Sequence, residues 1–231
     1  MIIKTLPLAK DYLAEKATLE AFAGHGCIKI LDYDELHLSL LLHRAIPGDS
    51  LRDHLDRFPT QEYSNVILGL NATTTPTNLE KLEDWLKVFD RVSQDCLPYN
   101  LVTKAHSLSK ELRNDPQPEV LLHGDLHCDN IIQDGSNWVA IDPKGLIGEA
   151  CFEVAKYDFF SDSMFRSDKD LQPDFHKQVE TLCKNLNLPK QRLLDWIFVR
   201  RVMGALWMIE DNSSPDYFLR QVEKLFPAQM V

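Results

Sequence analysis

The sequence has no paired cysteines, no long apolar run and no basic run, and each absence excludes a class of protein. Its five cysteines are an odd number, widely spaced and without a Cys-x-x-Cys pair, so we expect reduced thiols rather than a disulfide framework or a zinc knuckle. No stretch approaches the roughly 18 to 20 apolar residues of a membrane span, and the N-terminus becomes polar too early for a signal peptide. No Lys/Arg run could follow a phosphate backbone, so nucleic acid is not expected as a partner. The predicted location is cytoplasmic, with no membrane partner.

The chain is acidic and long enough to bury a core. It has 231 residues, 44% of them hydrophobic, with 35 Asp and Glu against 25 Lys and Arg and a formal net charge of −10. This length and composition predict one or two domains that fold without disulfides. A negative field would attract a cationic small substrate, but acidity also serves solubility, and both interpretations stay open here.

The periodicity of apolar residues changes at Pro47-Gly48. Before this point, apolar runs predict strands over 2–3, 27–33 and 36–43, with a helix over 11–23 between the first two. After it, strands are predicted only over 120–122, 131–132 and 138–141. Helices are predicted over 60–73, 79–96, 101–113, 151–161, 174–186 and 190–210, and after Pro215. A capping box at Thr77-Asn-Leu-Glu80 is expected to begin the helix over 79–96. The chain therefore reads as a small strand-rich lobe followed by a larger helical lobe that carries a loop and a hairpin.

One segment carries the residues that phosphoryl transfer requires. The sequence HGDLHCDN (residues 123–130) follows an apolar strand, and IDPKG (residues 141–145) ends the predicted hairpin. Phosphoryl transfer needs a carboxylate that deprotonates the attacking hydroxyl, together with oxygen ligands for the Mg²⁺ that bridges the nucleotide phosphates. Asp125 is the candidate base, and Asn130 and Asp142 are the candidate metal ligands. The other interpretation of Asp125 and Asn130 is an Asx turn and a loop cap, because both residue types favour turns.

The two motifs together resemble those of the aminoglycoside/hydroxyurea antibiotic resistance kinase family. The resemblance implies an α+β, protein-kinase-like fold with two lobes: a truncated β-rich N-lobe over 1–45 and a larger helical C-lobe over 46–231. It implies ATP and Mg²⁺ as cofactors and a small hydroxylated acceptor, aminoglycoside-like by resemblance. Antibiotic resistance is likewise an implication of the family.

The same resemblance assigns further residues. Lys4 is similar to the strand lysine that holds the α- and β-phosphates, and Glu15 to its helical ion-pair partner, although Glu20 competes for that role. The backbone of Leu42, His43 and Arg44 resembles the link between lobes that binds adenine. Two residues would support the catalytic loop: His123, by anchoring its backbone, and Glu153, at a position that is more often Asp in the family.

One departure from the family concerns the hairpin that covers the phosphates, which precedes the strand lysine. Only three residues precede Lys4, whereas two strands and a tight turn need roughly a dozen. We therefore expect that the chain starts inside a longer natural protein, works without the cover, or no longer works as a kinase. The edge of the Lys4 strand would then be exposed, which predicts either a homo-oligomer formed through that edge or a mobile N-terminus.

Two other classes of function stay open. The first is a catalytically silent binding protein that keeps the kinase fold. The second is a metallohydrolase built on His123, His127 and Asp125, although no HxH or HxxE partner appears elsewhere in the sequence. Lys4 has its own alternative, as a lysine near a flexible terminus.

Overall fold

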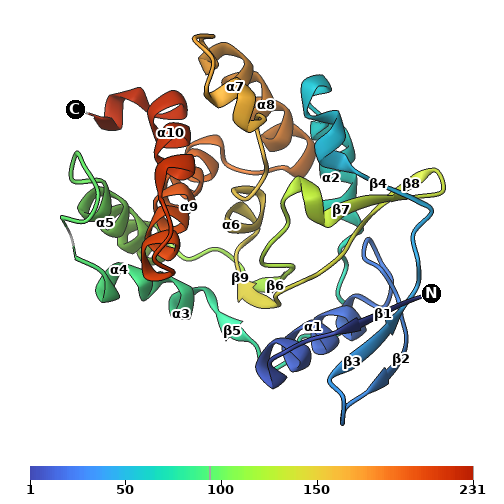
Figure 1. The fold of residues 1–231 in the computed structure, drawn as a ribbon. Coiled ribbons are helices and arrows are strands. Elements are labelled where there is room, and N and C mark those ends of the chain that lie inside the picture. The colour runs from blue at the N-terminus through green and yellow to red at the C-terminus, as the bar shows by residue number, and fades with distance from the viewer. Residues whose placement is uncertain (94, 231) are drawn as a thin grey trace.

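The computed structural model describes residues 1–93 and 95–230, which form a small lobe beside a larger helical lobe (Figure 1). The small lobe is a three-stranded antiparallel sheet in the order β1-β3-β2, with one helix beside it. Its elements are β1 (Ile2–Thr5), α1 (Ala9–Phe22), β2 (Ile30–Asp34) and β3 (Ser39–Leu42). The predicted antiparallel pair is confirmed, since β2 and β3 pair from Ile30↔Leu42 to Asp34↔Ser39. β1 lies at an edge of this sheet, and the homo-oligomer expected through that edge stays a prediction.

Helix α1 buries one face, and the carboxylate of Glu15 lies on that face. The helix ends where Ala23 (φ 52°) and Gly24 (φ 82°) adopt the left-handed conformation. Its buried residues include Tyr12, Glu15 and Leu19, which recur at helical spacing along one side. Glu15 therefore points inward from the same face that holds the helix against the protein.

The larger lobe contains two more three-stranded sheets, in the orders β4-β7-β8 and β5-β9-β6, surrounded by helices. The strands are β4 (Pro47–Ser50), β5 (Glu80–Lys81), β6 (Val120–Leu122), β7 (Ile131–Asp134), β8 (Asn137–Ala140) and β9 (Leu146–Gly148). The α-helices are α2 (Thr60–Gly69), α3 (Leu82–Leu86), α4 (Val88–Arg91), α5 (Leu101–Asn114), α6 (Ala150–Val154), α7 (Asp162–Phe165), α8 (Gln172–Leu186), α9 (Lys190–Glu210) and α10 (Asp216–Leu225). The 3₁₀ helices are η1 (Leu51–Arg57), η2 (Cys128–Asn130) and η3 (Pro227–Met230).

The helix predicted over 79–96 is wrong. The chain first forms β5, which pairs in parallel with β9, and then the short helices α3 and α4; residue 94 lies outside the described residues, as does residue 231. The predicted capping box is not used, because the Glu80 carboxylate accepts hydrogen bonds from the side chains of Lys10 and Trp85 instead. Asp84, in the first turn of α3, accepts from the backbone N–H of Lys81 at 3.1 Å. The helix predicted over 151–161 ends early, at Val154.

Helix α9 forms the centre of the large lobe and is buried on nearly all sides from Arg192 to Leu206. Trp196 is fully buried on it and meets the ring of Phe152 edge-to-face, with ring centroids 5.3 Å apart. Burying an aromatic side chain of this size contributes about 1.5 to 3 kcal/mol. The same helix carries two adjacent buried arginines, Arg200 and Arg201, so the core includes charge as well as apolar surface.

The structure describes the state of the cysteines and the lengths of the apolar helices. All five cysteines are free thiols. Among the described residues, no helix is both long enough and apolar enough to cross a membrane.

Candidate active site

The predicted base lies on the loop between β6 and η2 and faces a lysine that sequence analysis missed. Asp125 accepts from Lys156, whose Nζ lies 2.8 Å from Oδ1, and Lys156 follows the C-terminal end of α6. Burial raises the pKa of Asp125, but the charge and hydrogen bond of Lys156, together with the charges of His127 and Arg200, outweigh that effect, and the pKa lies below its ordinary value. Burial lowers the pKa of Lys156. Asp125 is therefore an ionised carboxylate at neutral pH, as a proton acceptor must be.

His123 ties the loop between β6 and η2 to the segment after β8 that carries Asp142. Its Nε2 donates to the carbonyl oxygen of Ile141 at 2.7 Å, and its Nδ1 accepts from the backbone N–H of Asp125 at 3.3 Å. The ring is fully buried, which lowers the pKa of His123 to about 4. His123 is thus a neutral imidazole at physiological pH, and both of its nitrogens are used within the chain.

Glu153 and Arg200 are buried side chains that bind the backbone of the loop between β6 and η2. The Oε2 atom of buried Glu153 accepts from the backbone N–H of Gly124 at 2.9 Å, and burial raises the pKa of this carboxyl. Arg200 donates to the carbonyl oxygens of Gly124 and Phe152. The N–H and the carbonyl of Gly124 are therefore both bound by buried side chains. Arg200 was not predicted, although two arginines within an apolar helical run are a recognisable signal of buried charge.

Asn130 is oriented by its amide nitrogen, which leaves its amide oxygen available as a ligand. Its Nδ2 donates to the backbone carbonyl of Asp125 at 2.9 Å, and its own backbone carbonyl accepts from the N–H of Ile141 at 2.9 Å. These contacts fix the side chain and leave Oδ1 as the acceptor atom.

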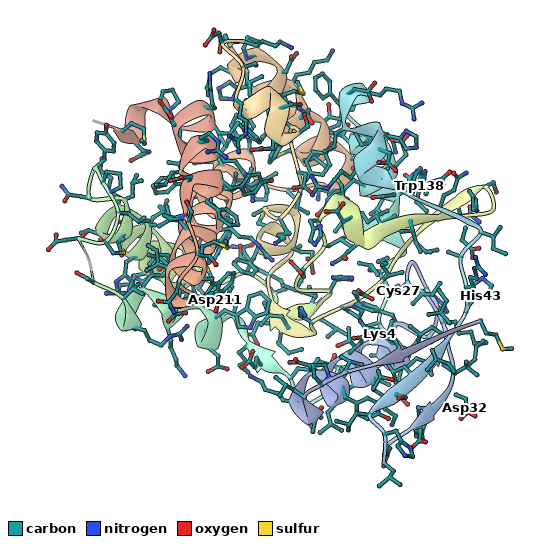
Figure 2. The ribbon with its side chains drawn as sticks, in the orientation of Figure 1. Lys4, Cys27, Asp32, His43, Trp138 and Asp211 are labelled. Atoms are coloured by element: carbon teal, nitrogen blue, oxygen red, sulfur yellow. The ribbon has the colours of Figure 1, made fainter. Side chains whose placement is uncertain are left out.

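Asp142 follows β8 and meets the two residues predicted in the small lobe. Lys4 Nζ lies 2.7 Å from Glu15 Oε2 and 2.9 Å from Asp142 Oδ1, so one ammonium joins both lobes. In Figure 2, Lys4 lies on the side of the small lobe that faces the larger lobe. Burial lowers the pKa of Lys4, but the two carboxylates outweigh it and the pKa is raised. Glu20 instead approaches Lys16, which separates the two candidates for the ion pair.

Asp142 itself has φ 59°, a left-handed conformation that Asp tolerates better than most residues and that turns its backbone sharply after β8.

The predicted adenine-binding segment ends the small sheet. Leu42 is buried at the end of β3, and the N–H of His43 already donates to the carbonyl of Lys29 at 2.9 Å. The His43 ring contacts Asp134 of the hairpin at 3.1 Å. The assignment of Leu42, His43 and Arg44 to adenine binding stays a prediction, and its donor cannot be the His43 amide as it now lies.

The residues around Asp142 fit a magnesium ion better than a transition metal. Asn130 Oδ1 and the half-exposed Asp142 carboxylate are hard oxygen donors, as Mg²⁺ prefers, and nucleotide phosphates would complete its coordination. Within residues 1–93 and 95–230, no three His, Cys, Asp or Glu side chains come together in a metal-binding group. His123 is unable to ligate while it holds Ile141, so the arrangement does not favour the metallohydrolase interpretation.

Cys128 lies inside the loop but is no nucleophile. It is fully buried, and burial raises its pKa well above the ordinary value.

The fold places the chain in the protein-kinase-like class. A choline/ethanolamine kinase family protein from Mesorhizobium loti superposes with a TM-score of 0.71 at 14% identity, covering 99% of this chain and 81% of that one. A thermostable mutant of an aminoglycoside phosphotransferase, in a ternary complex with ADP and hygromycin B, gives 0.65 at 15% identity, covering 94% and 83%. These similarities confirm the predicted α+β kinase-like fold.

Within this class, the chain belongs to the aminoglycoside/hydroxyurea antibiotic resistance kinase family, whose model matches residues 1–212. A streptomycin 6-kinase from Streptomyces glaucescens is 26% identical over 212 residues, which is 85% of this chain and 66% of the relative. A hydroxyurea phosphotransferase from Kitasatospora aureofaciens is 27% identical over 224 residues, 91% of this chain and 63% of the relative. The chain thus spans slightly less than two thirds of the length of each.

Proposed function

We propose that the protein is a small-molecule kinase that transfers the γ-phosphoryl group of Mg·ATP to a hydroxyl of its acceptor. The observation that carries the proposal is the convergence of Lys4, Glu15 and Asp142, which are far apart in sequence but joined by contacts of 2.7 to 2.9 Å. Family membership supports it, because the relatives include a streptomycin kinase and a hydroxyurea phosphotransferase. An ADP complex of a protein with this fold supports adenine nucleotide as the donor.

The proposed roles follow from the contacts. Asp125 accepts the proton of the acceptor hydroxyl as that oxygen attacks the γ-phosphorus. Asn130 Oδ1 and the Asp142 carboxylate would hold Mg²⁺, and the ion would supply positive charge against the phosphates. Lys4, held by Glu15, binds the phosphates that remain as ADP. His123 and Glu153 position the loop without touching substrate. The presence of all of these groups disfavours the silent binding protein.

Thermal unfolding with and without Mg·ATP tests the nucleotide site. Ligand at 100 times its Kd stabilises by about 2.7 kcal/mol, which is a shift of about 5 to 10 °C for a chain of this size. We expect that shift to require Mg²⁺ and to disappear in Asp142→Asn. Asp32→Asn is the matched control, because Asp32 lies on β2 at the outer side of the small lobe (Figure 2). No shift in the unmutated protein at millimolar Mg·ATP would reject the proposal.

Asp125→Asn separates the kinase from a silent binder. An amide accepts no proton, so transfer should fall by about 10² to 10⁴, whereas the Mg·ATP shift should remain. Transfer is measured as the rate at which the acceptor is phosphorylated and ADP is formed. Equal turnover in the variant would remove Asp125 from the mechanism.

A further inference from the structure

A cavity of about 160 Å³ opens beside the proposed base, and nothing described so far uses it. Lys156, which contacts Asp125, lies in its wall together with His127 of the catalytic loop. The opposite wall comes from α10, with Tyr217 and Phe218. Lys156 Nζ lies 2.8 Å and His127 Nε2 lies 3.8 Å from the Asp125 carboxylate, so two residues of the wall connect the cavity with the proposed base.

Another cavity, of about 320 Å³, lies behind the loop against Ile67 and Glu153. No residue that lines it contacts the Asp125 carboxylate, whereas Lys156 and His127 of the smaller cavity both do, so we do not assign the acceptor to it.

The charged groups of the smaller cavity are already paired with one another. Arg52 joins two of its carboxylates, with Nε 2.6 Å from Asp129 Oδ1 and Nη2 3.0 Å from Asp158 Oδ2. Lys156 neutralises Asp125. Arg201 also lines the cavity, but its guanidinium donates to backbone carbonyls at 2.7 and 3.0 Å. The wall therefore offers no carboxylate without a cation. Its arginine without a carboxylate partner, Arg201, is buried, and the backbone holds both of its Nη atoms.

The polar groups that remain available are uncharged. Within the part of the chain that the structure describes, 1–93 and 95–230, neither the Tyr217 hydroxyl nor the Gln221 side-chain amide has a hydrogen-bond partner, and both residues line the cavity. The ring of Phe218 adds an apolar surface, and it packs so closely on Gly204 of α9 that a Cβ there would lie 2.4 Å from the ring. Hydroxyl and amide groups beside an aromatic ring suit the C–H and O–H groups of a polyol.

We infer that the acceptor is a small uncharged polyhydroxylated compound rather than a polycation such as an aminoglycoside. This inference rests on the proposed function and specifies its acceptor. An ammonium group would meet Arg52, Lys156 and Arg201 without an unpaired carboxylate to compensate, and juxtaposed like charges are strongly unfavourable. The cavity is also smaller than the roughly 300 to 1,000 Å³ of pockets for drug-sized ligands. The chain as a whole is acidic, with a net charge of −10, but the wall of this cavity is not.

A set of matched six-carbon probes tests the charge preference: glucitol, its amine glucamine and its acid gluconate, with streptomycin as the polycation. Their affinities are measured on the enzyme loaded with Mg·ADP, and their phosphorylation is measured with Mg·ATP. We expect glucitol to bind at least about tenfold more tightly than glucamine or gluconate, and streptomycin not to compete. A preference for glucamine or streptomycin, or the same response to all probes, including none, overturns the inference.

Two variants connect the preference to the cavity. Arg52→Gln leaves Asp129 and Asp158 without their cation, so glucamine should bind roughly tenfold more tightly than in the unmutated protein. Arg57→Gln removes the same charge from the same 3₁₀ helix without lining the cavity, and should change nothing. Tyr217→Phe keeps the ring and should weaken glucitol about fivefold. Unchanged probe selectivity in both Arg52→Gln and Tyr217→Phe would mean that the acceptor binds elsewhere.

The thermal shift with Mg·ATP distinguishes a failure of the kinase proposal from a failure of the proposed acceptor class. If the shift is absent, the kinase proposal fails. If the shift is present and the charge preference is reversed, the kinase proposal stands and only the acceptor class is wrong.

Discussion

Lys156 is the residue whose charge sets the state of the proposed base. Its ammonium lies 2.8 Å from Asp125 and opposes the effect of burial on that carboxyl. In Lys156→Met the pKa of Asp125 should rise, because only the smaller effects of His127 and Arg200 then oppose burial. The acid limb of the kcat/KM profile should move up by about one to three pH units. A profile recorded from pH 4 to 9 measures this change.

Two further variants give that profile its controls. Lys156→Arg keeps the positive charge and should restore the acid limb, whereas a loss of packing alone would not be restored in this way. Lys177→Met removes an exposed lysine of α8 and should leave the profile unchanged. An unmoved acid limb in Lys156→Met would show that Lys156 does not tune the base.

At the scale of elements, Gly145 determines how closely α1 approaches the turn after β8 that carries Asp142, the proposed metal ligand. Gly145 has φ 70°, and a Cβ on it would lie 2.2 Å from Thr18 Oγ1 and 3.2 Å from the carbonyl of Ala14. Gly145→Ala should therefore push α1 away and draw Glu15, the residue after Ala14, from Lys4. We expect a loss of about 1 to 3 kcal/mol in the free energy of unfolding, together with a reduced Mg·ATP shift.

Gly135→Ala is the matched control for this experiment. Gly135 also has positive φ, 61°, but nothing lies within 4 Å of a Cβ there. It should show only the backbone cost of about 1 to 2 kcal/mol, with the Mg·ATP shift intact. Equal Mg·ATP shifts in the two variants would contradict the role given to the contact between Gly145 and α1. Both quantities are read from urea unfolding and thermal unfolding.

Local patterns predicted the elements around the site better than those away from it. The β7–β8 hairpin and the β2–β3 pair have alternating residues and turn signals, and both formed where expected. The helix over 79–96 failed because Glu80 and Lys81 pair with β9, a strand about 65 positions further along that no local pattern indicates. Lys156 and Arg52 were missed for the same reason, since their partners come from distant segments and a single lysine or arginine carries no motif.

For the molecule as a whole, the protonation of one buried histidine should couple stability to pH. The pKa of His123 falls from 6.5 to about 4 on burial, so between these values the unfolded chain binds a proton that the folded protein does not. Stability from this source is complete above pH 6.5 and is lost as the pH falls toward 4. The shift corresponds to roughly 3 kcal/mol by linkage.

His123→Gln isolates that contribution from the carboxylates that titrate in the same range. The free energy of unfolding, measured in urea from pH 7.5 to 4, should fall more steeply in the unmutated protein than in His123→Gln, and the difference should approach 3 kcal/mol at pH 4. His25→Gln replaces an exposed histidine near the end of α1 and should keep the steep dependence. If the unmutated protein and His123→Gln follow parallel curves, His123 is not held neutral by burial. A charged His123 ring would carry a proton on Nδ1 as well as on Nε2. The Nδ1 proton would face the N–H of Asp125, which is a donor, and would have no acceptor.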